Sequence, residues 1–255
     1  MLEVDELKLF FGDDYQINDK IKVLQPKIGD IITLGEATYF STVQTLTSTS
    51  SNMKSQLDSM GLDWEKIDDF QIFMMLSPTL TQDKTSLVLG DIDLTKFKPH
   101  ENKQHGEIVL VDTDSGIIID KLIYMQIADF IRKVHGFTRL CDKASTKFAH
   151  QMAIEMDREE IEKNKNKPYK SFLLPLISAL KARQGYTKEY IREMQIYELM
   201  NEVNRLQIIV QTDALLQGSY SGMVDTKKIP KESFNWLREI DNNKSMGQEL
   251  QTGTY

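Results

Sequence analysis

The stretch from Met194 to Gln217 constrains the fold most, because it is the longest run in the chain with a clear helical pattern. Its apolar side chains recur every three or four positions, at Ile196, Leu199, Met200, Val203, Leu206, Val210 and Ala214. This spacing places them on one stripe of an α-helix. Ile208 and Ile209 lie off the stripe, so we expect neighbours to cover the helix on both flanks. We expect Gly218 to end the helix, which has no catalytic signature and predicts a scaffold element.

The rest of the chain predicts an α+β fold, with short β-hairpins and helices in the N-terminal half and only helices in the C-terminal half. The predicted strands are 6–11, 20–24, 87–89, 92–97, 107–111 and 117–119. The predicted helices are 28–46 with an interruption near Gly35, a short helix capped by Ser50 or Ser51, 64–76, 120–134, 145–163, 172–181, a short helix after Thr187, and 231–239. The polar run 98–106 is interpreted as a loop.

Composition suggests three parts. Residues 1–140 form the mixed region with hairpins, and residues 141–240 form the helical region. Residues 241–255 are polar with little to bury, so we interpret them as a mobile tail.

Charge, cysteine use and hydropathy limit the class of protein. The formal charge of −7 argues against a dedicated nucleic-acid binder, which usually carries a basic excess. The single cysteine, Cys141, excludes an intramolecular disulfide framework and fits a reducing cytoplasm. The acidic N-terminus is unlike a signal peptide, and the apolar run 172–180 is far shorter than the ~20 residues of a membrane helix. We therefore expect a soluble intracellular protein without a membrane segment.

Two short motifs resemble functional sites but have simpler explanations. Asp112, Asp114 and Gly116 match the start of a calcium loop, but the glycine comes one position early and an apolar stretch replaces the distal ligands. A hairpin turn explains them better. Ser51 and Lys54 have the spacing of a serine–lysine nucleophile pair, yet the motifs that accompany such a pair are absent. Helix capping explains Ser51.

No catalytic, cofactor or metal site is predicted, so we expect the protein not to be an enzyme and to bind no cofactor. The histidines are His100, His105, His135 and His150. None of them stands four residues from another, the spacing that places two imidazoles on one helix face. Cys141 lacks the local signature of a nucleophile and is interpreted as a buried or half-buried residue.

The lysines between Lys163 and Lys170 surround Tyr169 and form a basic patch that could contact phosphate. They follow an acidic run, and cations at a helix C-terminus are favoured by the helix dipole. We therefore favour a solvated helix end, and nucleic-acid binding through this patch remains the alternative.

The polar helix predicted at 145–163 has a thin apolar stripe, formed by Phe148, Met152, Met156 and Ile161. A helix with so little apolar surface gains little from packing. It therefore either lies on the surface with a shallow contact or docks on another chain. The chain's twelve methionines favour docking, because methionine adapts to irregular contacts, and these four residues are the predicted partner-binding residues.

Several stretches together resemble uncharacterised proteins of the structural gene modules of tailed phages and prophages of Gram-positive bacteria. They are Gly116–Met125, Leu215–Gly222, Asp225–Ile229 with Asn235 and Trp236, and Lys167–Ser171. The resemblance implies a non-enzymatic protein that acts in virion morphogenesis through protein–protein contacts. Such a protein would be a tail assembly factor or chaperone, or a structural component of the particle. Its partners would be other phage structural or tail proteins or further copies of itself, in the host cytoplasm or the virion.

Overall fold

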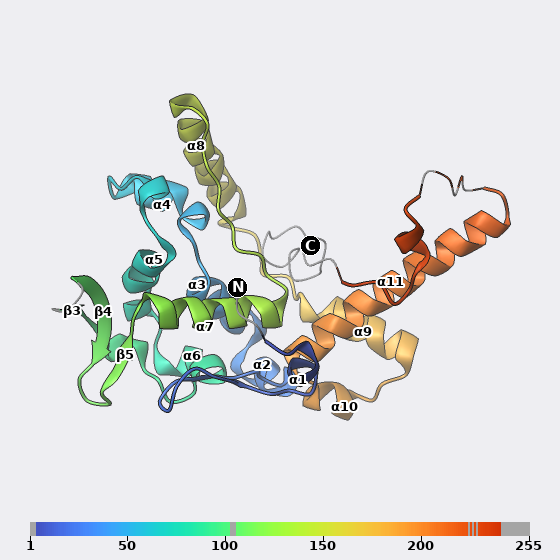
Figure 1. The fold of residues 1–255 in the computed structure, drawn as a ribbon, viewed down its shortest axis with the longest axis horizontal. Helices are drawn as coiled ribbons and strands as arrows, with labels where there is room; N and C mark the ends of the chain where they lie inside the picture. Colours follow the sequence, from blue (N-terminus) through green and yellow to red (C-terminus); the bar gives the residue numbers. More distant parts are fainter. Residues whose placement is uncertain (1–3, 103–105, 224, 226, 228, 241–255) are drawn as a thin grey trace.

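The computed structural model describes residues 4–102, 106–223, 225, 227 and 229–240, and it confirms the α+β class (Figure 1). The α-helices are α1 (Glu6–Phe10), α2 (Ile28–Leu34), α3 (Glu36–Leu46), α4 (Lys54–Ser59), α5 (Asp69–Leu76), α6 (Gln82–Leu89), α7 (Lys121–His135), α8 (Lys147–Asn164), α9 (Leu173–Gln184), α10 (Lys188–Glu193) and α11 (Ile196–Tyr220). Single turns of 3-10 helix are η1 (Ser50–Asn52), η2 (Trp64–Lys66), η3 (Ser77–Thr79), η4 (Leu94–Lys96) and η6 (Lys231–Phe234).

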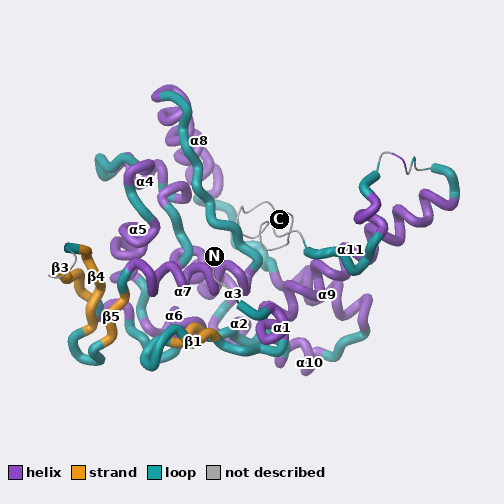
Figure 2. The backbone as a smooth tube through the Cα atoms, viewed as in Figure 1, coloured by secondary structure: helices purple, strands orange, loops and turns teal. Residues whose placement is uncertain are grey.

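Two small antiparallel sheets lie in the N-terminal half (Figure 2). One pairs β1 (Tyr15–Gln16) with β2 (Lys22–Val23). The other has the order β3 (Lys98–Asn102), β4 (Glu107–Asp112), β5 (Ile117–Ile119), with Val111 opposite both Lys98 and Ile118. The predicted hairpin at 107–119 is therefore confirmed. The loop prediction for 98–106 is wrong for its first part, because an edge strand can be held by backbone pairing alone and needs no apolar pattern.

The predicted strand at 6–11 is wrong, because these residues form α1 and the N-terminal hairpin begins later, at Tyr15. Asp5 explains the helix: its carboxylate accepts a hydrogen bond from the Leu7 backbone N–H at 3.0 Å. The predicted strands at 87–89 and 92–97 are also wrong. The first is the apolar end of α6, and the second forms the turn η4, capped by Asp93.

Glycine and aspartate divide two of the predicted helices. Gly35 has a φ of 102°, which only glycine adopts readily, and it separates α2 from α3 as predicted. The helix predicted at 64–76 is divided into η2 and α5, because Asp68 forms a capping box with Gln71 at the start of α5. The predicted cap at Ser50 or Ser51 is wrong: the short helix that ends near Met60 is α4, whose N-cap is Met53 without a side-chain hydrogen bond, while Ser50 and Ser51 lie inside η1.

The N-terminal half of α11 lies in the main hydrophobic core, as the apolar stripe predicts. Ile196 and Leu199 are fully buried and Val203 is 8 % exposed. The core cluster draws on both predicted regions of the chain, with Leu46 and Ile131 from the first packed together with residues such as Leu199 from the second.

The C-terminal half of α11 extends away from this core (Figure 1), so the stripe prediction fails there. Val210 is 46 % exposed and Ala214 is also exposed. Gly218 does not end the helix, which continues to Tyr220, and the positive φ of 70° belongs to Gly222.

The segment 229–240 folds back along this extended half of α11. The Arg205 guanidinium donates to the backbone carbonyls of Trp236 and Arg238 at 2.9 and 2.8 Å. Arg238 in turn donates to the Thr212 hydroxyl at 3.2 Å. The helix predicted at 231–239 is reduced to the single turn η6, and the predicted tail at 241–255 lies outside the described residues.

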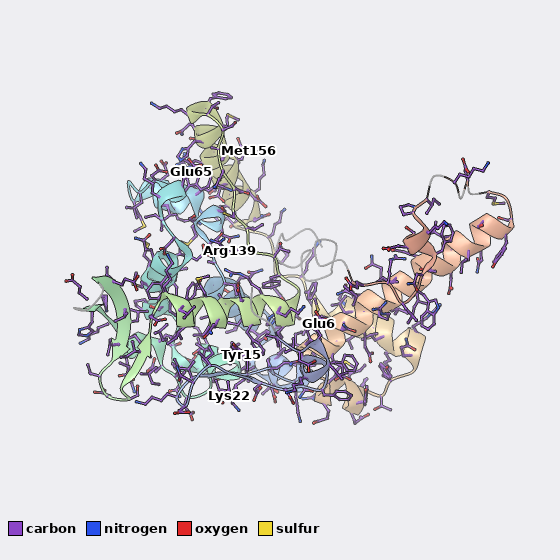
Figure 3. The ribbon with its side chains drawn as sticks, in the orientation of Figure 1. Glu6, Tyr15, Lys22, Glu65, Arg139 and Met156 are labelled. Atoms are coloured by element: carbon purple, nitrogen blue, oxygen red, sulfur yellow. The ribbon has the colours of Figure 1, made fainter. Side chains whose placement is uncertain are left out.

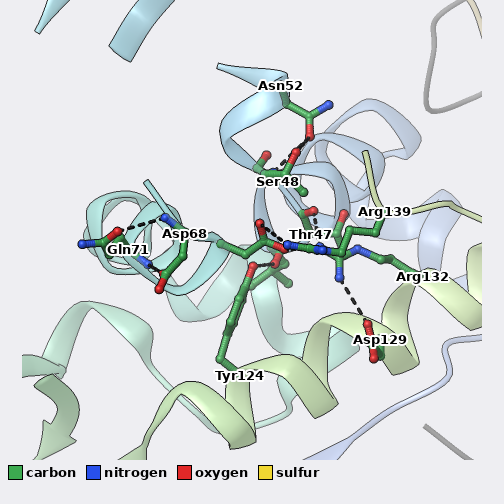
Figure 4. Close-up of polar contacts among 12 residues, drawn as sticks. Thr47, Ser48, Asn52, Asp68, Gln71, Tyr124, Asp129, Arg132 and Arg139 are labelled. Carbon is green, nitrogen blue, oxygen red and sulfur yellow. Dashed lines mark hydrogen bonds and ion pairs between the residues drawn. The ribbon is translucent and has the colours of Figure 1, made fainter. Parts of the chain in front are cut away.

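Two buried polar groups tie α7 to its neighbours. The Arg132 guanidinium, with a side chain 7 % exposed, donates to the Thr47 carbonyl at the end of α3 at 2.9 Å and lies 3.5 Å from the Asp69 carboxylate of α5 (Figure 4). His135 is fully enclosed: its Nδ1 donates to the Ile131 carbonyl, so its Nε2 accepts from the Tyr39 hydroxyl, both at 2.7 Å. Burial lowers the pKa of His135 to about 4.

Candidate protein-interaction surface

Helix α8 projects from the body of the molecule beside α4 (Figure 1). It begins at Lys147, where the Thr146 hydroxyl accepts a hydrogen bond from the Ala149 N–H at 3.1 Å. Ile154 is its only buried residue. The predicted helix at 145–163 is thus confirmed, and so little burial means that the helix has a contact on only one side.

Ile154 holds α8 on the body through a small hydrophobic cluster that is separate from the main core. Its buried partners are Leu57 of α4, Trp64 of η2 and Ile72 of α5, all 1 % exposed or less. The Trp64 ring also stacks on the imidazole of His150, with 5.3 Å between the ring centroids.

Polar contacts fix the same face of α8. The Asp157 carboxylate accepts hydrogen bonds from the backbone N–H and the hydroxyl of Ser55, at 2.8 and 2.6 Å, in the first turn of α4. Arg158 pairs with Asp58 at 3.1 Å. Together with Ile154 these contacts define the orientation of α8, so its remaining faces are presented to solvent in a fixed arrangement.

The face of α8 turned away from α4 carries large exposed apolar side chains. Phe148 is 76 % exposed, Met152 42 % and Met156 65 %. They follow one another at four-residue steps, and at about 100° per residue they fall within one quarter of the helix surface. We call these three residues the α8 stripe; Figure 3 labels Met156 on this helix.

Ile161 does not belong to the α8 stripe, although the sequence analysis grouped it there. It stands seven residues after Ile154, close to two helical turns, and so lies on the docked side of the helix. Ile161 is nonetheless 42 % exposed. The structure therefore brings together three of the four predicted partner-binding residues.

Acidic residues border the α8 stripe. Helix α8 contains five acidic and three basic residues, namely Glu155, Asp157, Glu159, Glu160 and Glu162 against Lys147, Arg158 and Lys163. Glu155 and Glu159 border one side of the stripe, where they pair with Arg158 at 2.9 Å and Lys163 at 3.2 Å. These ion pairs are exposed, and such pairs are worth only about 0–1 kcal/mol. Their carboxylates therefore remain available to an incoming cation.

Asp63, Glu65 and His150 are the one set of metal-ligating side chains grouped closely in the part of the chain that the structure describes, within 4.8 Å of one another. Each already has a structural partner. Asp63 bonds to Lys66 at 3.0 Å and to His150 Nε2 at 3.2 Å, and Glu65 accepts from the Ala144 N–H at 2.8 Å. This arrangement joins the start of α8 to η2, and it accounts for all three groups without a metal ion.

The other candidates from the sequence have structural roles. Asp112 accepts from the Asp114 N–H at 3.1 Å in a hairpin turn that ends at Gly116, where φ is 64°, so the turn prediction is confirmed. Ser51 accepts from the Asp142 N–H at 2.9 Å. Cys141 is exposed, which corrects the buried interpretation.

The remaining candidates from the sequence are two histidines and the basic patch. His100 lies on β3, and His105 lies outside the described residues. Residues 163–170 are all exposed. Two of the patch lysines are engaged by acidic residues of α8, Lys163 by Glu159 and Lys165 by Glu162.

Sequence reasoning missed the docked face of α8. The available signal was the group Ala153, Ile154 and Asp157. On a helical projection these three residues share the face opposite the α8 stripe. Their partners in α4, η2 and α5 are distant in sequence, so no local pattern indicates the contact.

Residues 162–241 match the family model described as the YomV second domain. The match runs from the last residues of α8 through η6, and the family is associated with phages and prophages, which supports a phage protein. Neither the curated proteins nor the solved structures gave a match to this chain. Within the described ranges, no helix is both long enough and apolar enough to cross a membrane.

Proposed function

We propose that this phage protein acts without enzymatic activity in virion morphogenesis, and that the α8 stripe is its contact with another phage structural or tail protein. Its role is that of an assembly factor, such as a chaperone that covers a tail protein before polymerisation. The observation that carries the proposal is the two-sided character of α8: one face is fixed to the body by Ile154 and Asp157, and the other presents large apolar side chains to solvent.

An apolar face in such a fixed arrangement is costly to leave in water. Each large apolar side chain gains about 1.5–3 kcal/mol when it is fully buried. Phe148 and the two methionines could each gain part of this on binding, and methionine accommodates irregular partner surfaces. Spaced anchors of this kind are what helix-in-groove recognition uses.

The proposal includes two competing arrangements. As an assembly factor the protein leaves the finished particle, and as a component it stays there. A different class of function is the alternative: a nucleic-acid-associated phage protein that uses the basic patch Lys163–Lys170. Two lysines of this patch, Lys167 and Lys170, are exposed and form no ion pair among the described residues.

Deletion of the gene from the phage that encodes the chain tests the proposal. We expect the yield of infectious particles to fall at least a hundredfold while phage DNA accumulates normally, because assembly and not replication is blocked. A plasmid copy restores the yield, whereas the double variant Met152→Glu with Met156→Glu does not. Met125→Glu is the matched control and should restore the yield, since Met125 is 49 % exposed and belongs to α7, which lies apart from α8 (Figure 1).

The outcomes separate the functions. A normal particle yield after deletion contradicts the proposal. Reduced phage DNA instead supports the nucleic-acid alternative, which salt-dependent binding to DNA or RNA would then confirm. Particles purified from the complemented strain distinguish a component, which they contain, from an assembly factor, which they lack.

A further inference from the structure

We infer that the partner of the α8 stripe is a basic amphipathic helix of a different protein, with an apolar ridge flanked by lysine or arginine. This inference rests on the proposed function, because it takes the α8 stripe as the contact surface, and it adds the chemistry of the partner.

The geometry of the stripe favours a helix as the partner. Phe148, Met152 and Met156 form a ridge at four-residue spacing, which spans about 12 Å at a rise of about 1.5 Å per residue. Ridges of this spacing interlock with the same spacing on a second helix, in the commonest class of helix packing. Helix α8 projects from the body (Figure 1), so a second helix can lie along it.

The charges beside the stripe favour a basic partner. Glu155 and Glu159 border one side of the stripe, and Glu160 stands four residues after Met156, at the next position of the same ridge. Glu160 forms no ion pair with any residue in the described ranges, and the pairs of the other two are exposed. Cations placed along one side and at the end of an apolar ridge would meet these carboxylates as the ridge packs, and such complementarity selects partners.

A second copy of the chain fits the stripe poorly. Pairing two α8 helices through the stripe would bring Glu155 and Glu159 of both copies to the same contact, and each copy has a formal charge of −7. Like charges brought together across an interface oppose binding. The same acidic border argues against the phosphate backbone of a nucleic acid at this face.

Two synthetic helical peptides test the inference with the full chain. Both have about 18 residues and the same leucine ridge, and they differ only in flanking lysines or flanking glutamates. Fluorescence anisotropy should show that the lysine peptide binds at least tenfold more tightly than the glutamate peptide. This preference should shrink when salt rises from about 0.05 M to about 0.3 M, because salt screens exposed charges.

Variants locate the binding on α8. Met152→Ser with Met156→Ser should weaken binding of the lysine peptide at least tenfold, and Met125→Ser should leave it unchanged. Glu155→Gln, Glu159→Gln and Glu160→Gln together should reduce the preference for lysine to less than threefold. Thermal melting of every variant shows that it is folded, since all of these side chains are at least partly exposed.

Three results would overturn the inference. They are equal binding of the two peptides, lysine-peptide binding that is indifferent to the stripe variants, and a wild-type dimer that becomes monomeric on Met152→Ser with Met156→Ser. The proposed function fails separately. If the lysine peptide binds as expected but particle yield is normal after deletion, only the proposed function is contradicted. If particles are lost but the lysine peptide is not preferred, only the partner chemistry is contradicted.

Discussion

Val203 and Val210 stand two turns apart on α11 but differ sharply in exposure, at 8 % and 46 %. We expect Val203→Asp to cost about 3 kcal/mol or more, because it places an unpaired carboxylate against the main core. The variant should be insoluble or melt far below the wild type. Val210→Asp, on the same helix, should melt within a few degrees of the wild type. Equal melting of the two variants would show that the Val203 side of α11 is not part of the core.

His135 makes stability depend on pH. Its pKa is lowered to about 4 by burial, from an ordinary value of 6.5, so the folded state keeps it neutral at a pH where the unfolded chain binds a proton. The free energy of unfolding that His135 contributes is fully present above about pH 6.5. It decreases as the pH falls and changes no further below about pH 4. Between pH 7 and pH 4.5 this loss amounts to about 2 kcal/mol.

Urea denaturation at both pH values measures this effect. The substitution His135→Gln offers the Tyr39 hydroxyl an amide oxygen without a titrating group. The free energy of unfolding of this variant should therefore fall by about 2 kcal/mol less than that of the wild type over the same pH interval. Parallel loss in the two proteins would mean that His135 titrates normally and is open to water.

At the scale of elements, the sequence predicts where helices begin and end better than it predicts which residues pack against them. The bounds of α7 and α8 and the cap of α10 at Thr187 were predictable, because capping residues and apolar spacing are local signals. The strand expected at 87–89 failed because a short apolar run cannot distinguish a strand from a buried helix end, and the strand expected at 92–97 failed because Asp93 caps the turn η4. The docked face of α8 was unpredictable for a different reason: Ile154 meets residues of α4, η2 and α5 that are remote in sequence.

Helix α8 should respond differently to changes on its two faces. Met152→Glu with Met156→Glu should leave melting within about 2 °C of the wild type, since both methionines are exposed. Ile154→Asp should detach the helix, because Ile154 is its only buried residue. In this Ile154→Asp variant, exchange of the backbone amide hydrogens should become fast in residues 147–164 and stay slow in α7. Unfolding of the double variant would place the methionines in the core.

At the scale of the whole molecule, the chain consists of a packed body with α8 and the C-terminal half of α11 extending from it (Figure 1). The body holds the buried polar ties at Arg132 and His135, whereas the largest exposed apolar side chains of α8 lie on the face turned away from the body. This division favours a rigid scaffold that presents a contact surface.

No metal is expected to hold this scaffold together. EDTA should leave the melting temperature and the circular dichroism spectrum unchanged, because Asp63, Glu65 and His150 are engaged with Lys66, Ala144 and one another. A drop of many degrees, reversed by added zinc, would identify those three groups as a metal site that fixes α8.

The most direct test of the central claim is site-specific photo-crosslinking in cells that produce the phage. A photoreactive phenylalanine analogue replaces Met152 of the α8 stripe, and the same analogue at Met125 on α7 serves as the control. We predict a covalent adduct at position 152 with a phage structural or tail protein, identified by mass spectrometry, and no such adduct at position 125. The same adduct at both positions, an adduct with nucleic acid, or none at position 152 would contradict the account.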